Sequence, residues 1–254
     1  MRYKPHDYQK YAIHFIKEHP IAAVLLDMGM GKSSITLTAI MDLMYGSFEV
    51  SKALIIAPLR VAKNTWSAEI EKWDHLKGLR YSIAVGSAAE RKRALMADAD
   101  VYIINRENIP WLVEKSGLPF DYDMVVIDEL SSFKNWQAKR FRALMKVRPK
   151  VKRIVGLTGT PSSNGLMDLF AEYKILDMGE RLGRFIHARD HAHDLGEAAH
   201  LANLLHLLEQ VVHREALAQH ALGVLELLLV CHLLGLLDDA HHVAHAEDAL
   251  GHAV

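Results

Sequence analysis

The sequence predicts an α/β domain with a mostly parallel sheet, followed by a helix-prone or poorly folded tail. Six apolar runs of strand length alternate with stretches of helical spacing, which is typical of a sheet covered by helices on both sides. Several runs are rich in Ile and Val and lack polar alternation, as strands buried on both faces do. The runs span residues 21–26, 53–57, 81–85, 101–104, 124–127 and 153–157.

Two of the other stretches carry apolar residues three to four positions apart, which places them on one helix face. The first precedes the first strand, and the second, less regular, follows the second strand. Their members are Tyr8, Tyr11, Ala12, Phe15 and Ile16 in the first, and Val61, Thr65, Ile70 and Trp73 in the second. In a sheet of this kind, ligands are expected at the carboxyl ends of the strands.

The composition is that of a globular protein and excludes a mainly disordered, collagenous or disulfide-stapled chain. Half of the 254 residues are hydrophobic and 24% are charged. The single cysteine, Cys231, favours a reducing compartment. The first residues lack an apolar signal core, and the longest apolar run, 225–237, is shorter than the ~20 residues of a membrane span. We therefore expect a soluble, cytoplasmic protein with no membrane partner.

A glycine-rich segment, DMGMGKSS at residues 27–34, stands between the first predicted strand and a helical stretch. Such a turn lets backbone N–H groups converge on phosphate oxygens at the positive end of a helix. In that geometry Lys32 reaches the β- and γ-phosphates, and the Ser33 hydroxyl holds Mg²⁺. The strict P-loop pattern has one more glycine, where Leu26 stands here. A simple helix cap with a solvated lysine is the alternative interpretation.

Two adjacent carboxylates, Asp128 and Glu129, end the apolar run MVVID. There Asp128 would bind Mg²⁺ and Glu129 would polarise an attacking water. An ordinary acidic turn before a helix is the alternative. Together with the glycine-rich segment, however, the pair supplies the second half of a nucleotide-hydrolysing site. A third strand then ends in the small residues Thr158, Gly159 and Thr160, which allow close approach of neighbouring loops.

In this order the motifs resemble the N-terminal RecA-like P-loop lobe of superfamily-two helicases, most closely the Swi/Snf-type DNA-dependent ATPases, including bacterial and phage members. The likeness covers about residues 3 to 186. It is carried by HDYQKYAIHFI for the opening motif, LDMGMGKS for a variant P-loop, ALIIAPLRVAKNTWSAEIEKW for motif Ia, IINREN for motif Ib, VVIDELSSFKN for motif II and LTGTPSSNGLMDLFAEYKIL for motif III. The variant P-loop of this family accounts for the missing glycine.

The resemblance implies an ATP hydrolase that uses ATP and Mg²⁺ in the cytoplasm of a bacterial or phage-infected cell. Catalytic roles would fall to Lys32, Asp128 and Glu129, and Ser33 and Asp128 would hold the metal. Gln9 of the opening motif would read the adenine. The nucleotide would also contact the P-loop residues Asp27, Met28, Gly29, Met30, Gly31, Lys32, Ser33 and Ser34.

The resemblance also implies a DNA partner. The protein is expected to contact the sugar–phosphate backbone of duplex DNA. Contacts with DNA would come from Pro58, Leu59 and Arg60 of motif Ia and from Asn105 and Arg106 of motif Ib. The coupling motif would be formed by Thr158, Gly159 and Thr160 of motif III. Backbone contacts position a protein without specifying sequence. The alternatives within enzymes are an RNA helicase or a restriction-type translocase lobe. A non-enzymatic alternative is an ATP-switched DNA-binding module that does not hydrolyse ATP.

Two departures from the family pattern bear on activity. Motif II continues with Leu130 and Ser131 where many relatives carry Ala-His, so the usual contact from the fourth position toward motif III is not expected. The second RecA-like lobe, which supplies an arginine finger worth roughly 10³–10⁵ in rate in related nucleotidases, is not recognisable. We therefore expect nucleotide binding but weak turnover by this chain alone, unless a second lobe acts in trans.

The excess of basic over acidic residues in the first 186 positions is compatible with a phosphate-binding face but does not prove one. Residues 1–186 contain 28 Lys and Arg against 21 Asp and Glu. A basic stretch near the end of this region either contributes to DNA binding or is a solvated helix face and loop. The stretch comprises Arg140, Arg142, Lys146, Arg148, Lys150, Lys152 and Arg153. The four tryptophans are expected to pack inside the protein rather than to stack on bases; they are Trp66, Trp73, Trp111 and Trp136.

A boundary is predicted near residue 186 because the composition changes there. Residues 187–254 hold 2 Arg, no Lys, 10 acidic residues and 12 of the 16 histidines, and lack eight further residue types. A helical appendage is one interpretation, and a metal site at His241, His242 and His245 is another. A frameshifted or reversed segment accounts best for the tail, because several residue types and the family pattern are lost at the same point. Reading the gene in all frames tests this hypothesis. We assign this His/Leu/Ala-rich tail no function.

Overall fold

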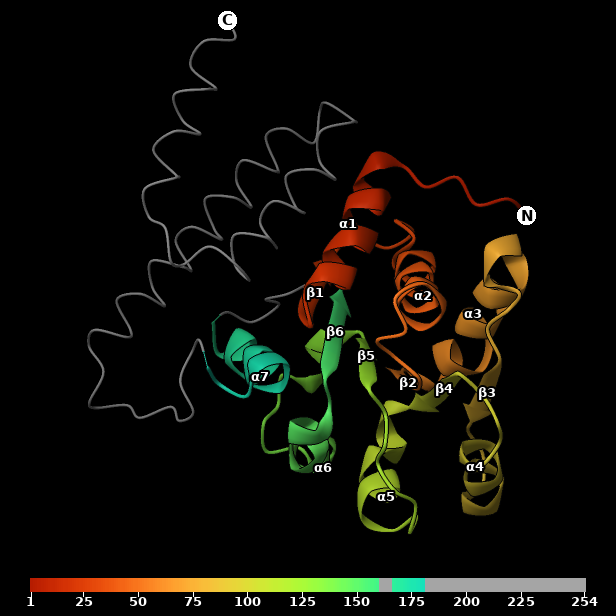
Figure 1. Cartoon of the computed structure of the whole chain (residues 1–254). Helices are drawn as coiled ribbons and strands as arrows, with labels where there is room; N and C mark the ends of the chain where they lie inside the picture. Colours follow the sequence, from red (N-terminus) through yellow and green to blue (C-terminus); the bar gives the residue numbers. More distant parts are fainter. Residues whose placement is uncertain (160–165, 181–254) are drawn as a thin grey trace, which may run out of the picture.

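The apolar runs form strands because neighbours on both sides and helices on both faces exclude water from them. The computed structural model describes residues 1–159 and 166–180, and in this part of the chain six strands form one parallel sheet in the order β1-β6-β5-β2-β4-β3 (Figure 1). The strands are β1 (Ile21–Leu25), β2 (Ala53–Ala57), β3 (Tyr81–Ala84), β4 (Val101–Asn105), β5 (Met124–Asp128) and β6 (Arg153–Thr158). The predicted α/β class with a parallel sheet is confirmed.

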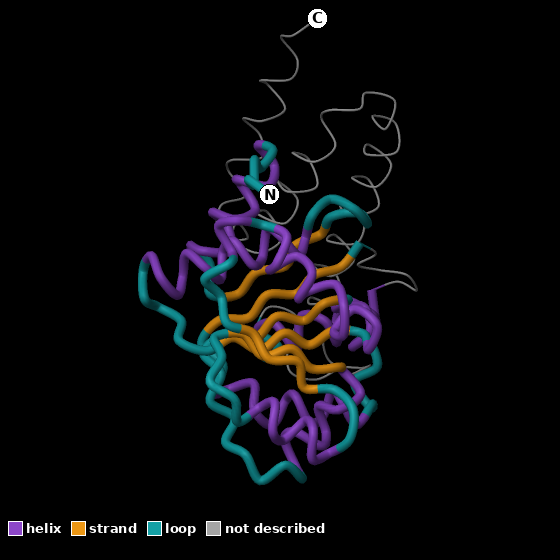
Figure 2. Tube along the Cα trace, turned by 90° about the vertical axis from the view of Figure 1, so that its right-hand side faces the viewer, coloured by secondary structure: helices purple, strands orange, loops and turns teal. Residues whose placement is uncertain are grey.

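Helices cover the sheet on both faces, as Figure 2 shows. Helices α1, α2 and α3 pack beside one another on one side, and α5, α6 and α7 on the other. The helices are α1 (Asp7–Glu18), α2 (Lys32–Met41), α3 (Leu59–Lys72), α4 (Ala88–Leu95), α5 (Ile109–Glu114), α6 (Lys139–Val147) and α7 (Leu166–Asp177). A π-helical turn, η1 (Asp42–Gly46), extends α2, and the short 3₁₀ turns are η2 (Asp74–Leu76), η3 (Arg106–Asn108), η4 (Leu130–Phe133) and η5 (Arg148–Lys150).

Both predicted helices exist, but the buried face of α3 differs from the prediction. Ala62, Trp66 and Ile70, each four residues apart, face the core, whereas Thr65 is exposed. The spacing of four follows the helical repeat more closely than the predicted set did. In α1 the predicted face is mostly right, although Tyr11 is 40% exposed.

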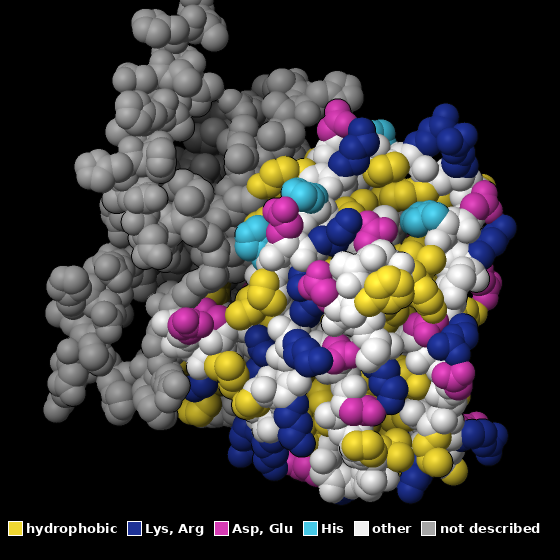
Figure 3. Space-filling model, in the orientation of Figure 1, with side chains coloured by type: hydrophobic (Ala, Val, Ile, Leu, Met, Phe, Trp, Pro, Cys, Tyr) yellow, Lys and Arg dark blue, Asp and Glu magenta, His cyan; other side chains and the backbone are white. Residues whose placement is uncertain are grey.

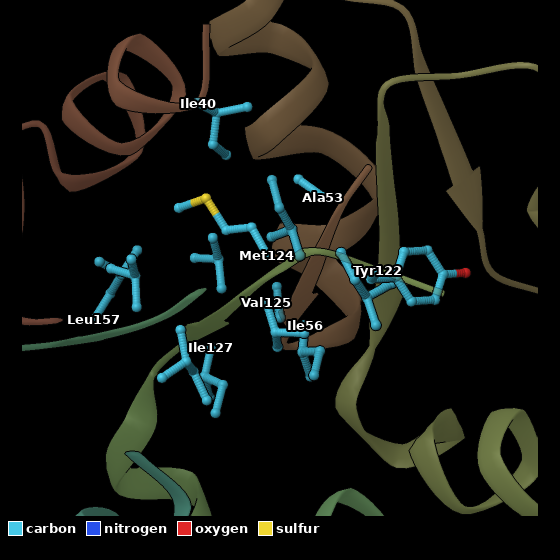
Figure 4. Packing of buried hydrophobic residues seen from close by; sticks show 14 of the residues in the cluster. Ile40, Ala53, Ile56, Tyr122, Met124, Val125, Ile127 and Leu157 are labelled. Atoms are coloured by element: carbon cyan, nitrogen blue, oxygen red, sulfur yellow. The ribbon is translucent and has the colours of Figure 1, made fainter. Parts of the chain in front are cut away.

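The core lies between the central strands and the helices on either side. Figure 4 shows Ile56 of β2 beside Val125 and Ile127 of β5, with Ile40 of α2 above them. All five residues of β2 and of β4 are buried, which explains why these strands read as apolar runs without alternation. No helix in the described part of the chain is long and apolar enough to cross a membrane.

At the amino ends of the strands, the carboxylates of the buried Asp100 and the half-buried Asp123 join neighbouring strands. Asp123, just before β5, accepts hydrogen bonds from the Ser51 backbone N–H at 3.0 Å and the Ser51 hydroxyl at 2.5 Å, and pairs with Lys152 at 2.8 Å. Asp100, just before β4, accepts from the Arg80 backbone N–H at 2.8 Å and its Nη2 at 2.6 Å. Each carboxylate therefore joins segments that enter adjacent strands.

Two buried arginines at the same edge hold the carboxyl ends of helices. Arg148 donates from Nε to the Ile175 carbonyl at 2.7 Å, from Nη1 to the Val151 carbonyl at 3.1 Å, and from Nη2 to the Leu176 carbonyl. Arg153 donates from Nη2 to the Ile16 carbonyl at 2.9 Å. They are 3% and 8% exposed, so these two members of the basic stretch are structural, and neither of the predicted alternatives, DNA binding or a solvated surface, is right for them.

Candidate functional site

Three loops meet at the carboxyl ends of adjacent strands. Since β6 lies between β1 and β5, the segment after β1, the acidic pair after β5 and the turn after β6 are neighbours (Figure 1). The backbone N–H of Leu26 donates to the Thr158 carbonyl at 3.2 Å, which extends the β1–β6 pairing past the strand. A Cβ at Gly159 would lie 3.4 Å from the Leu26 carbonyl oxygen and 3.8 Å from Lys32 Nζ. These are ordinary van der Waals distances, so the turn after β6 lies in contact with the segment after β1.

The glycine-rich turn leads directly into α2. Gly29 and Gly31 have φ values of +85° and +82°, the left-handed region that side chains rarely adopt. The positive φ favours glycine at position 31, and a Cβ there would also lie 2.6 Å from Gln9 Nε2 and displace that amide. The next residue, Lys32, begins α2, and its first backbone N–H groups point toward the turn. Met28 is 94% exposed, so its side chain extends into solvent.

Lys32 binds the turn that precedes it. Its Nζ donates to the Asp27 carbonyl at 3.0 Å and also to the Leu26 carbonyl. These are neutral acceptors, and a phosphate oxygen would be a stronger acceptor for the ammonium group. The predicted contact between Lys32 and phosphate therefore needs only an exchange of hydrogen-bond partners. Ser33 and Ser34 follow in the first turn of α2, where Ser34 donates to the Gly31 carbonyl at 2.9 Å.

Asp128 ends β5 with a largely buried carboxyl group. Burial raises its pKa and the adjacent Glu129 carboxylate adds to the increase, whereas a hydrogen bond from Trp66 and the charge of Lys32 oppose it. The indole Nε1 of Trp66 donates to Asp128 Oδ2 at 2.9 Å. A buried carboxylate in this state gains from a nearby cation, which would stabilise its charged form.

The donor set fits Mg²⁺ bound together with phosphates. A hydroxyl (Ser33) and a carboxylate (Asp128) are the hard oxygen donors that Mg²⁺ prefers, and Mg²⁺ in nucleotide sites is held by one or two such groups plus the phosphates. Within residues 1–159 and 166–180, no cluster of three or more His, Cys, Asp or Glu residues is placed to hold a metal by itself. The suggested histidine ligands lie outside these ranges.

Glu129 is held in a left-handed conformation, with φ of 62° and ψ of 66°. For a residue with a side chain this conformation costs roughly 1–2 kcal/mol. Its Oε1 accepts from the Ser131 hydroxyl at 2.5 Å and from the Thr158 hydroxyl at 3.3 Å. The acidic pair is thus joined to the turn after β6 through Glu129 itself. Ser131, the fourth residue of the predicted motif II, therefore supports the same carboxylate.

The opening motif contacts the glycine-rich turn. Gln9 is 7% exposed, and its Nε2 donates to the Met30 carbonyl at 3.2 Å while its Oε1 accepts from the His6 backbone N–H at 3.0 Å. The Tyr8 hydroxyl donates to the same Met30 carbonyl at 3.2 Å. The sequence identified Tyr8 only as a helix-face residue, because its polar contact lies 22 positions away along the chain.

The predicted DNA-contacting segments follow β2 and β4, which are neighbouring strands. Pro58 caps α3, Leu59 is 47% exposed and Arg60 is exposed. Asn105 is buried and donates to Glu107 Oε2 at 3.1 Å, and Arg106 Nε donates to Glu107 Oε1 at 2.9 Å. Arg60 and Leu59 therefore face solvent, whereas Asn105 shapes its own turn. Thr160 lies outside the described residues.

The surface charge in view is mixed. Figure 3 shows Lys and Arg side chains interspersed with Asp and Glu over the visible face. Arg140 donates from Nη2 to the Ser132 carbonyl at 2.6 Å, and Lys146 pairs with Glu114 at 2.6 Å. These members of the basic stretch are engaged with the protein. The surplus of basic residues in 1–186 therefore does not form a uniformly basic surface on this face.

Comparison with known proteins identifies the family. The model of the SNF2-related domain matches residues 8–225. The chain belongs to this family. Protein p41 of Acyrthosiphon pisum secondary endosymbiont phage 1 is 40% identical over 192 residues, 73% of this chain and 42% of that protein. The DNA excision repair protein ERCC-6-like of Mus musculus is 29% identical over 190 residues, 70% of this chain and 15% of that protein.

A solved structure supports the same fold. The SWI2/SNF2 ATPase core of Sulfolobus solfataricus in complex with dsDNA matches with a TM-score of 0.61 and 25% identity, over 70% of this chain and 37% of that one. The chain spans less than half the length of these relatives. The predicted resemblance to Swi/Snf-type ATPases is confirmed. The SNF2-related match continues past residue 186, where the domain boundary stays a prediction because residues 181–254 lie outside the described part.

Proposed function

We propose that this SNF2-related domain is the ATP-binding and ATP-hydrolysing lobe of a DNA-dependent translocase that acts on duplex DNA. The observation that carries the proposal is the meeting of the glycine-rich turn, the acidic pair and the Thr158 turn on three adjacent strands. Each feature alone has an ordinary structural explanation. Their convergence at one edge supports the proposal, in which the turn would bind phosphate, Asp128 would bind the metal and Glu129 would act as the general base.

The roles follow from the contacts. Lys32 and the first N–H groups of α2 would bind the β- and γ-phosphates. Ser33 and Asp128 would hold Mg²⁺, which when bound neutralises charge on the phosphate oxygens. Glu129, fixed by the Ser131 and Thr158 hydroxyls, would orient and polarise the attacking water. Gln9 would read the adenine from its place beside the turn.

DNA would lie along the part of the same edge formed by β2 and β4. The exposed Arg60 at the start of α3 and the half-buried Arg106 after β4 would contact backbone phosphates. The neighbour from Sulfolobus solfataricus was solved with dsDNA, which supports a duplex as the partner.

We expect turnover by this chain alone to be weak, because the family's arginine finger belongs to a second lobe. Such a lobe could act in trans, and the cytoplasm is the proposed location.

The test is ATP binding and steady-state hydrolysis by the full chain, with and without duplex DNA. Lys32→Ala should weaken ATP binding by about 10- to 100-fold, since it removes a charged hydrogen bond to phosphate. Lys92→Ala, an exposed lysine on α4, is the matched control and should bind as the wild type does. Wild-type binding no tighter than that of Lys32→Ala would overturn the proposal.

The same assay separates the alternatives. Stimulation by duplex DNA but not by RNA supports the translocase assignment, and stimulation by RNA alone would favour an RNA helicase lobe. ATP-dependent DNA binding with hydrolysis at the level of Lys32→Ala would identify a nucleotide-switched binding module. Strong DNA-stimulated turnover would show that the site is completed without the family's second lobe.

A further inference from the structure

The metal-binding carboxylate has a buried hydrogen-bond partner that the proposed mechanism does not use. Trp66 lies on α3, and its side chain is 0% exposed. Its indole Nε1 donates to Asp128 Oδ2 at 2.9 Å across a sequence separation of 62. An indole N–H can only donate, so this contact specifies which oxygen of Asp128 faces the helix. In the proposed function, the other oxygen of Asp128 would bind Mg²⁺.

We propose that Trp66 is a positioning residue for Asp128, which fixes the carboxylate so that one oxygen is presented to Mg²⁺. The inference rests on the proposed function, because it assigns a role within that site. Groups that orient metal ligands are typically worth 10- to 100-fold in metal affinity. A free carboxylate at the end of a strand would rotate about its side-chain bonds. The rigid ring of Trp66, packed in the core, removes that freedom.

A second tryptophan on the same helix shows what a merely structural contact looks like. Trp73 caps α3 and donates from Nε1 to Glu69 Oε2 at 2.7 Å. This pair is local, four residues apart, and the Glu69 side chain is 23% exposed. Both tryptophans thus give an N–H to a carboxylate, but only the carboxylate bound by Trp66 belongs to the nucleotide site. Trp73→Phe is therefore a matched control for Trp66→Phe.

The experiment measures binding of a fluorescent ATP analogue to the full chain, titrated with MgCl₂ and repeated in EDTA. Trp66→Phe should raise the Mg²⁺ concentration for half-maximal binding by about 10-fold. Affinity in EDTA should stay unchanged, because the phosphate-binding turn is intact. Trp73→Phe should match the wild type in both conditions. A purely structural role would weaken binding equally with and without Mg²⁺.

Because Trp66 is fully buried, a second variant guards against loss of folding. Site-specific replacement of Trp66 by benzothienylalanine keeps the ring size and removes only the N–H donor. The same shift in Mg²⁺ dependence in this variant supports the inference. A folded variant with wild-type Mg²⁺ dependence, or with equal losses in Mg²⁺ and EDTA, overturns it. A wild type that binds no nucleotide in either condition would instead overturn the proposed function, and this inference would fall with it.

Discussion

The two edges of this sheet differ in how their polar groups are used. At the amino ends of the strands, charged side chains are engaged with backbone groups: Asp123 accepts from Ser51, and Arg148 donates to three carbonyls. At the carboxyl ends, Lys32 donates to the carbonyls of Leu26 and Asp27, which are neutral acceptors that a phosphate oxygen would replace in the proposed function. The amino edge satisfies its polar groups internally, whereas the proposed function requires the carboxyl edge to exchange some of its internal hydrogen bonds for contacts with a ligand.

The parallel topology explains the difference. Helices that connect parallel strands run opposite to them, so their carboxyl ends gather at one edge and their amino ends at the other. Arg148 and Arg153 neutralise the negative ends of α7 and α1. The positive end of α2 faces the nucleotide side, where phosphates would neutralise it. If the proposed function is right, stability and ligand binding depend on opposite edges of the sheet, so we expect that each can be perturbed separately.

The largest effect is expected from Arg148→Met. The substitution leaves the carbonyls of Val151, Ile175 and Leu176 without their buried donor, so the free energy of unfolding should fall by about 3 kcal/mol. Urea denaturation measures it, with the exposed Arg142→Met on α6 as control. Nucleotide affinity of the folded variant should not change. A loss below about 1 kcal/mol would contradict the assigned role of Arg148.

A smaller, pH-dependent effect is expected from Asp123→Asn. Burial of Asp123 favours its neutral form, but Lys152 and the Ser51 donors outweigh burial and hold the pKa at about 2. Since the pKa is lower in the folded state than the ~3.9 of an unfolded chain, the carboxylate stabilises the fold above pH ~4. That contribution, about 2 kcal/mol, is lost as the pH falls from ~4 toward ~2.

Urea denaturation at pH 7, 4 and 3 checks this expectation. The wild type should be more stable than Asp123→Asn at pH 7, and the difference should shrink on acidification. Asp121→Asn is the control, because its ion pair with Lys52 is half-exposed and worth little. A difference between wild type and Asp123→Asn that stays constant from pH 7 to pH 3 would disprove the role of this carboxylate.

The sequence predicts the sheet well because its signals are local. All six apolar runs became strands within a residue or two of the predicted bounds, and the parallel order brought the three motifs to one edge. A buried strand is recognisable from its own residues. Likewise, the predicted strand ends place Lys32, Asp128 and Glu129 at one edge of the sheet, where the structure also has them, while their catalytic roles stay a prediction.

What the sequence missed depends on distant contacts. Nothing near Trp66 indicates that its N–H meets Asp128, and nothing near Tyr8 indicates the Met30 carbonyl. Arg148 and Arg153 read as part of a basic surface because composition does not reveal burial. The predicted strand over 153–157 does place Arg153 at the amino end of a parallel strand, away from the site, but it does not reveal that the side chain is buried. By contrast, hydrogen-bond partners on different elements, such as Trp66 and Asp128, can be identified only from the packed structure.

The smallest effect is expected from Gly156→Ala, where a change in core packing should alter both the free energy of unfolding and ATP hydrolysis. A Cβ at Gly156, inside β6, would lie 2.6 Å from Leu130 Cδ2 and 3.3 Å from Leu176 Cδ2. Gly156→Ala should therefore cost about 1 kcal/mol, since overpacking outweighs the reduced entropy of the unfolded chain. Leu130 directly follows Glu129, so relief of the clash should also displace Glu129 and slow ATP hydrolysis.

The double variant Gly156→Ala, Leu130→Ala decides whether this clash is the cause. Leu130→Ala removes the side chain that the new methyl group would meet, and it restores the alanine that many relatives carry at this position. The two substitutions should cost less together than the sum of their separate costs, with an interaction of about 1 kcal/mol in urea denaturation. Additive costs would mean that Gly156 is required by backbone conformation rather than by Leu130. Coupling would instead show that the larger residue after Glu129 depends on a glycine in the adjacent strand, so that packing beneath the site limits which residues can follow its acidic pair.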